Sequence, residues 1–273
     1  MLGKLIKHEI KNSARYVMAI YFAAAAVCAF MLLGMLAKVM WVTVVGSMLL
    51  YTVGIAAVIM TLVSVIKNFY DSLYGRQGYL TFTLPVKCSS ILISKVLVSF
   101  FWIILSFLLL VLIFVLIFAN AKAQTGESLG GVVEALEVSG ILEMLPSLNM
   151  IIRFASVLGS VALMYILTFV GFVYFSVTLA NTRSLQKHPK LFGFMIFFGI
   201  YSVANSLGAV ITSKFPLSFN ITNQKCFLAF TAMSREEGVI ASFGLGGAIF
   251  MALMAVGLLF ATGWFMEHKV NVK

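Results

Sequence analysis

Long runs of apolar residues, separated by short polar segments, make up most of this chain. A helix that crosses a bilayer needs roughly 20 apolar residues, and six of the runs are long enough. They lie at about residues 16–36, 39–66, 96–119, 154–179, 191–213 and 241–266. The pattern therefore predicts an all-α integral membrane protein, with one transmembrane domain of six helices spanning residues 1–273.

The first two runs are separated only by a short break near Gly34 and Lys38. A single helix over residues 16–66 would be about 75 Å long, at roughly 1.5 Å per residue. Because that is far more than one crossing requires, we expect a tight helical hairpin at the break.

Charged residues are scarce, at 10% against 62% hydrophobic residues, and the net charge is +10. If the N-terminus is cytoplasmic, 13 of the 19 bases flank the spans on the inside and six of the nine acids lie outside. Such an asymmetry indicates orientation, so we expect both termini and residues 67–95 to be cytoplasmic. The bases are spread over several juxtamembrane segments, which favours contact with anionic membrane lipid over nucleic acid.

Residues 1–15 read as an amphipathic helix in the inner membrane interface. Apolar side chains share one helical face, and bases occupy much of the rest: Leu2, Leu5, Ile6 and Ile10 against Lys4, Lys7, Lys11 and Arg15. The alternative is a charged tail ahead of the first span.

Residues 67–95 form the longest predicted cytoplasmic segment, and it is too rich in aromatic and apolar residues for a solvated linker. Pro85 interrupts it. Apolar residues of this kind either form an interaction site or pack on the inner ends of the chain's own helices, and the residues alone leave both open.

Residues 78–86 read Gly-Tyr-Leu-Thr-Phe-Thr-Leu-Pro-Val, and Ser94-Lys95 precedes the third apolar run. This sequence, in this place, resembles the permease subunits of bacterial ABC-2-type exporters. Gln77 stands where an acid commonly precedes the Gly-Tyr-Leu, so a salt bridge from that position to a partner is not expected.

The resemblance implies a six-span permease in a bacterial cell membrane, paired with a second permease as a homodimer or heterodimer. It also implies that residues 67–95 dock on a separate ATPase subunit, which would bind ATP and Mg²⁺. The expected contact residues are Tyr79, Leu80, Phe82, Leu84 and Pro85.

The two predicted outer segments are longer than hairpin turns. Residues 120–153 have the pattern of an amphipathic helix on the outer surface. Residues 214–240 are apolar enough to enter the membrane, as the re-entrant outer helices of ABC-2 permeases do, with a surface loop as the alternative.

The apolar runs lack the groups that most membrane chemistry requires. No run has an ionisable residue near its centre, which disfavours a secondary carrier, and no phosphate-binding GxxxxGK[ST] loop occurs. We therefore expect no enzymatic activity, no cofactor and no metal in this chain. A transporter of this composition must obtain its energy from another subunit.

Hydroxyl and amide groups form stripes along the second and fifth runs. Such groups usually bond neighbouring membrane helices, and the alternative is a weakly polar path or a dimer seam. The residues concerned are Ser47, Tyr51, Thr61, Ser202, Asn205 and Ser206.

The expected function is therefore that of the membrane-spanning subunit of an ATP-driven exporter. The alternative from a different class is a membrane scaffold or assembly subunit that transports nothing. A pore or secondary carrier is a third interpretation, disfavoured by the uncharged spans.

Overall fold

The computed structural model describes residues 2–37, 39–75, 78, 88–125, 148–182, 188–222, 226–230 and 239–268. The chain divides into two compact units, Met1–Ala135 and Leu136–Lys273. The described residues contain six helices that are long and apolar enough to cross a membrane. The predicted set of six spans is thus confirmed by length and composition.

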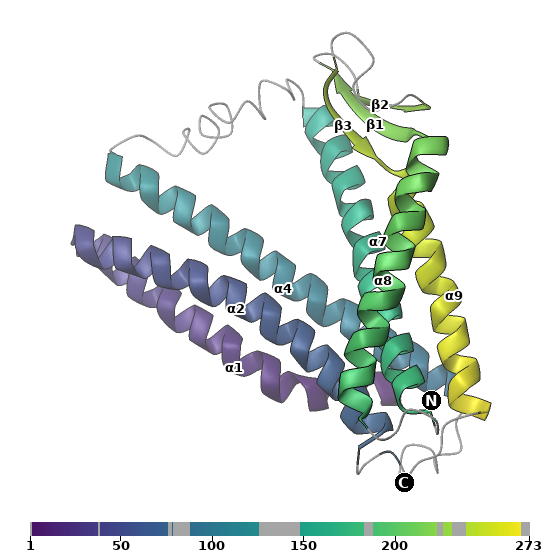
Figure 1. Ribbon diagram of the computed structural model, residues 1–273. Coiled ribbons are helices and arrows are strands. Elements are labelled where there is room, and N and C mark those ends of the chain that lie inside the picture. Colours follow the sequence, from purple (N-terminus) through teal and green to yellow (C-terminus); the bar gives the residue numbers. More distant parts are fainter. Residues whose placement is uncertain are drawn as a thin grey trace. The chain divides into compact units, whose positions relative to one another are not determined.

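The first unit consists of three helices, α1 (Leu2–Leu36), α2 (Met40–Leu73) and α4 (Cys88–Thr125). Each of them packs against the other two (Figure 1). The core contains one cluster around Val17, Val98 and Trp102 and another around Met31, Leu50 and Ile113.

The predicted hairpin between the first two spans is present, and its tightness depends on Gly34. Val39 donates its backbone N–H to the Gly34 carbonyl at 3.1 Å. A Cβ atom on Gly34 would lie 2.5 Å from Cγ1 of Val42. Only glycine leaves the space for α2 to begin so close to the end of α1.

The second unit consists of helices α7 (Leu148–Ala180), α8 (Pro189–Lys214) and α9 (Gly246–His268), with a small sheet. Pro189 lies in the first turn of α8, where its missing N–H costs nothing. The three helices share a buried cluster of Phe172, Ala204, Met251 and Ala255.

The sheet corrects the prediction for residues 214–240. Strands β1 (Leu217–Thr222), β2 (Cys226–Phe230) and β3 (Val239–Gly244) form an antiparallel sheet in the order β2-β1-β3. A re-entrant helix there is therefore wrong, and the fold is not purely all-α. Residues 217–222 read Leu-Ser-Phe-Asn-Ile-Thr, and this strict alternation is typical of a strand rather than a membrane-dipping helix.

The helix bounds also differ from the predicted span bounds. Residues 2–15 belong to α1, which continues into the first span without a break. α2 extends to Leu73, beyond the predicted end at 66, and α4 begins at Cys88 rather than 96. Charged residues limit how far a helix fits the hydrocarbon, but they do not end the helix itself. Residues 67–73 and 88–95 of the predicted segment therefore belong to α2 and α4, and residues 74–87 connect the two helices.

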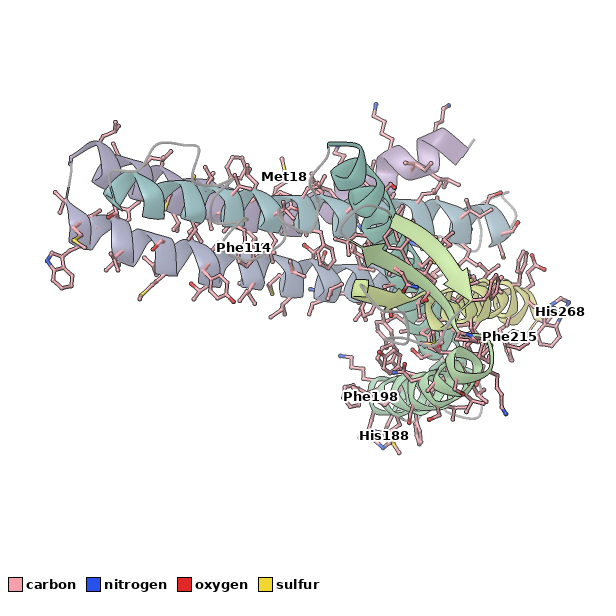
Figure 2. All side chains as sticks on the ribbon, turned by 90° about the horizontal axis from the view of Figure 1, so that it is seen from above. Met18, Phe114, His188, Phe198, Phe215 and His268 are labelled. Carbon is pink, nitrogen blue, oxygen red and sulfur yellow. The ribbon has the colours of Figure 1, made fainter. Side chains whose placement is uncertain are left out.

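Many large apolar side chains point outward from each unit, as a membrane protein requires (Figure 2). Met18 and Phe114 do so in the first unit, and Phe198 and Phe215 in the second. In water, apolar surface of this extent would be a liability. Its extent on helices of spanning length supports a multi-pass membrane protein.

The predicted amphipathic helix on the outer surface rested largely on residues 126–147, which lie outside the described residues. The same applies to the predicted docking residues at 79–85. The interfacial position of residues 1–15 and the cytoplasmic position of the termini stay predictions.

Candidate functional site

The first unit contains a column of polar side chains between its three helices. On α4 the polar residues Lys95, Ser99, Trp102 and Ser106 are spaced by four, three and four. This spacing places them on one helical face. The facing positions on α1 and α2 are polar as well, and the resulting contacts form two clusters.

The first cluster is centred on a buried ion pair between α1 and α4. Lys95 Nζ lies 2.6 Å from Glu9 Oε1, and the two side chains are 1% and 14% exposed. The same ammonium donates to Ser72 Oγ of α2 at 2.5 Å. A buried ammonium is tolerable only when it is paired and hydrogen-bonded, and this one meets both conditions.

Asn68 of α2 connects the carboxylate to the rest of the cluster. Its Nδ2 group donates to Glu9 Oε2 and to Ser13 Oγ, both at 3.0 Å, and its Oδ1 atom accepts from Asn12 Nδ2 at 2.9 Å. Ser13 in turn donates to the Glu9 carbonyl at 2.8 Å. Both carboxylate oxygens of Glu9 therefore have a donor, one from each neighbouring helix.

The second cluster lies further along the same helices. Thr61 Oγ1 and Ser106 Oγ are 2.7 Å apart, and Ser106 Oγ is 2.8 Å from the Tyr21 hydroxyl. Thr61 and Ser106 are both 1% exposed. The three hydroxyls again come one from each helix, so the cluster fixes the register of all three.

The positions predicted as a path or dimer seam do not come together as one site. Thr61 is in the core of the first unit, while Tyr51 is half exposed and packs edge-on against Phe114. Ser47 donates to a carbonyl of its own helix. The remaining three residues, Ser202, Asn205 and Ser206, lie on exposed positions of α8 in the second unit.

The predicted docking residues Tyr79, Leu80, Phe82, Leu84 and Pro85 lie outside the described residues. The helices on either side of them are described. α2 ends at Leu73, next to Ser72, and α4 begins at Cys88 and contains Lys95. The Ser72–Lys95 hydrogen bond joins residues 23 apart in sequence, on the two sides of the connecting segment.

Sequence reasoning missed the ion pair because it assigned both charges to the membrane flanks. Two signals were available. Glu9 is the first acid of the chain, and residues 4–15 around it contain four bases and one histidine. The next acid is Asp71. Lys95 stands directly before an apolar run. An acid among bases, together with a base at the start of an apolar run, indicates an ion pair in which each charge neutralises the other.

Comparison with protein-family models, with curated proteins and with solved structures finds no match. Among the described residues there is no group of three or more His, Cys, Asp or Glu side chains that could hold a metal ion. The geometry of the site is that of a polar connection between α1, α2 and α4, next to the ends of α2 and α4 that residues 74–87 join.

Proposed function

We propose that this chain is the membrane-spanning permease subunit of an ATP-driven exporter of the ABC-2 type. A separate ATPase subunit would bind and hydrolyse ATP-Mg, and a second permease would complete the substrate path. The chain would lie in a bacterial cell membrane with both termini and residues 67–95 in the cytoplasm.

The observation that carries the proposal is the attachment of the connecting segment to three helices. Residues 74–87 begin beside Ser72 and end before Lys95. Lys95 donates to both Ser72 and Glu9. A force on the segment would therefore act on α1, α2 and α4 together. A subunit driven by a partner ATPase needs a connection of this kind, because otherwise the segment would move without its spans.

The resemblance of residues 78–86 to ABC-2 permeases supplies the partner, and the apolar character of the segment supplies the contact. Interfaces are held mainly by a few buried aromatic and apolar residues. Tyr79, Leu80 and Leu84 are the expected anchors, and Phe82 and Pro85 are expected to contact the same ATPase.

The test is co-purification of an ATPase from the native host in mild detergent, with Leu80→Asp and Leu84→Asp variants. A charge at either anchor should reduce the recovered ATPase at least tenfold, since an unpaired carboxylate in an apolar contact is costly. Leu228→Asp is the matched control, because Leu228 is 62% exposed on β2, in the predicted outer segment.

Recovery of a full complement of ATPase with the Leu80→Asp, Leu84→Asp double variant would move the docking site elsewhere. Absence of any ATPase from the wild-type preparation would favour the scaffold over the permease. Membrane insertion of each variant is checked by its resistance to carbonate extraction.

A further inference from the structure

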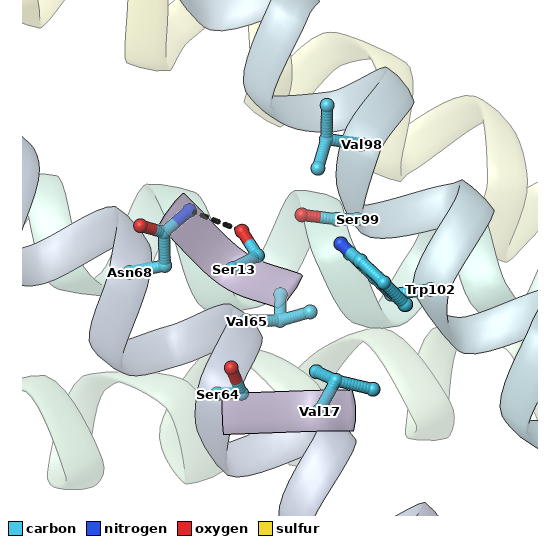
Figure 3. Close-up of a pocket in the computed structure, with 8 residues that line it drawn as sticks. All are labelled: Ser13, Val17, Ser64, Val65, Asn68, Val98, Ser99 and Trp102. Carbon is cyan, nitrogen blue, oxygen red and sulfur yellow. Dashed lines mark hydrogen bonds between the residues drawn. The ribbon is translucent and has the colours of Figure 1, made fainter. Parts of the chain in front are cut away.

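A small cleft separates the two polar clusters of the first unit. All three helices contribute to its walls, and its polar lining consists of Ser13, Ser64, Asn68, Ser99 and Trp102 (Figure 3). Val17, Val65 and Val98 complete it. The cleft therefore has hydroxyl, amide and indole groups around a space otherwise closed by valines.

One polar atom in this cleft has no hydrogen-bond partner. Trp102 is 5% exposed, and its indole nitrogen Nε1 is buried without an acceptor. Figure 3 shows this nitrogen directed towards the space between Ser13 and Ser99. An indole N–H is a donor only, and a buried donor without an acceptor is destabilising. The indole N–H group therefore needs an oxygen acceptor in the cleft.

The size and polarity of the cleft decide what that acceptor is. The space has room for roughly one water molecule. A buried water requires two to four polar partners, and the hydroxyls of Ser13, Ser64 and Ser99 supply acceptors beside the indole donor. A lipid phosphate with its substituents is too large for a space of this size.

We propose that the cleft is a binding site for one structural water molecule. The water accepts a hydrogen bond from Trp102 Nε1 and donates its two protons to two of the serine hydroxyls in the lining. Because Ser13 also accepts from Asn68, the water extends the Glu9–Lys95 cluster to Trp102 of α4. The water then connects α1 and α4 inside the cleft, beside the contact that Asn68 of α2 makes with Ser13. This inference does not depend on the proposed transport function.

The experiment observes the indole hydrogen bond directly. Trp41 and Trp264 are 81% and 49% exposed, and replacing both with Phe leaves Trp102 as the only tryptophan. Ultraviolet resonance Raman spectroscopy then reports whether the indole N–H is hydrogen-bonded, in the purified full-length protein. We expect the band of a hydrogen-bonded indole, and the band of a free indole N–H would overturn the proposal.

Two substitutions at Ser99 separate water from a protein acceptor. Ser99→Ala removes the hydroxyl but keeps the space, so the indole should stay hydrogen-bonded to water. Ser99→Val fills the space, so the bond should be lost. Loss of the bond in Ser99→Ala would identify the Ser99 hydroxyl itself as the acceptor, and retention in Ser99→Val would place the acceptor outside the cleft. Either result overturns the proposal.

A third comparison separates water from a lipid oxygen. The single-tryptophan protein is measured in an alkyl maltoside detergent after delipidation, and again in phospholipid vesicles. The bonded band should be the same in both, because water is present in both. If the band of a hydrogen-bonded indole appears only in the vesicles, the acceptor is a lipid oxygen, and the proposed water site is overturned. Gel filtration confirms that each variant is folded and monodisperse.

Discussion

At the scale of single residues, the buried ion pair is where the structure adds most to the sequence. Lys95 and Glu9 are 86 positions apart, and no local pattern connects them. Each looks like an ordinary flanking charge when it is considered alone. Their pairing depends on the way α1 and α4 pack, which is information that only the folded chain contains.

Removing one partner of the pair should be more harmful than removing both. Lys95→Met leaves Glu9 with only the Asn68 donor, and Glu9→Gln leaves the Lys95 ammonium buried without its counter-charge. Each single change should lower the stability of the first unit by about 3–5 kcal/mol, whereas the double variant should recover much of the loss. Thermal unfolding in detergent measures the stability of the two single variants and of the double variant.

Lys4→Met is the matched control, because Lys4 is an exposed lysine on the same helix as Glu9. It should change the stability of the unit by less than about 0.5 kcal/mol. Additive losses in the double variant would mean that Glu9 and Lys95 do not act as a pair.

At the scale of elements, the apolar runs predicted the helices because run length alone decides whether a segment can cross a bilayer. They could not predict where each helix ends. α2 continues to Leu73 because Lys67, Asn68 and Asp71 are compatible with a helix although they do not suit hydrocarbon. The sheet was missed because residues 217–222 were judged by their mean apolar character, while their alternation carried the signal.

Close packing of α7 against α9 provides a prediction at this scale. A Cβ atom on Gly171 would lie 2.9 Å from the Ala255 carbonyl oxygen and 3.0 Å from its Cβ. Because backbone cannot move aside as a flexible side chain does, Gly171→Ala should destabilise the second unit by about 1–3 kcal/mol. Thermal unfolding of the purified variant checks this value.

Gly159→Ala, on the same helix, is the comparison that isolates the contact. A Cβ atom on Gly159 would meet nothing within 4 Å. Because alanine favours the helix over glycine by about 1 kcal/mol, this change should be neutral or stabilising. Equal destabilisation by both substitutions would show that Gly171 is not needed for the close approach of α7 and α9.

At the scale of the whole molecule, the charge asymmetry of the flanks is the basis for the orientation. The charged end of the polar column, at Glu9 and Lys95, lies beside residues 74–87, so the ion pair is on whichever side of the membrane that segment takes. The candidate docking site needs this orientation, because an ATPase that uses cytoplasmic ATP must meet residues 74–87 on the inside.

Cysteine labelling in intact cells tests the orientation after Cys28, Cys88 and Cys226 are changed to serine. A cysteine at the exposed position His8 should be protected from a membrane-impermeant reagent until the cells are opened. A cysteine at Ser128 should react in intact cells, because residues 120–153 are predicted to be outside. Ser72 would be a poor probe for the inner side, since it is 7% exposed and holds Lys95. Labelling at position 8 but not at 128 in intact cells would reverse the orientation, and an ATPase contact at residues 79–85 would then be impossible.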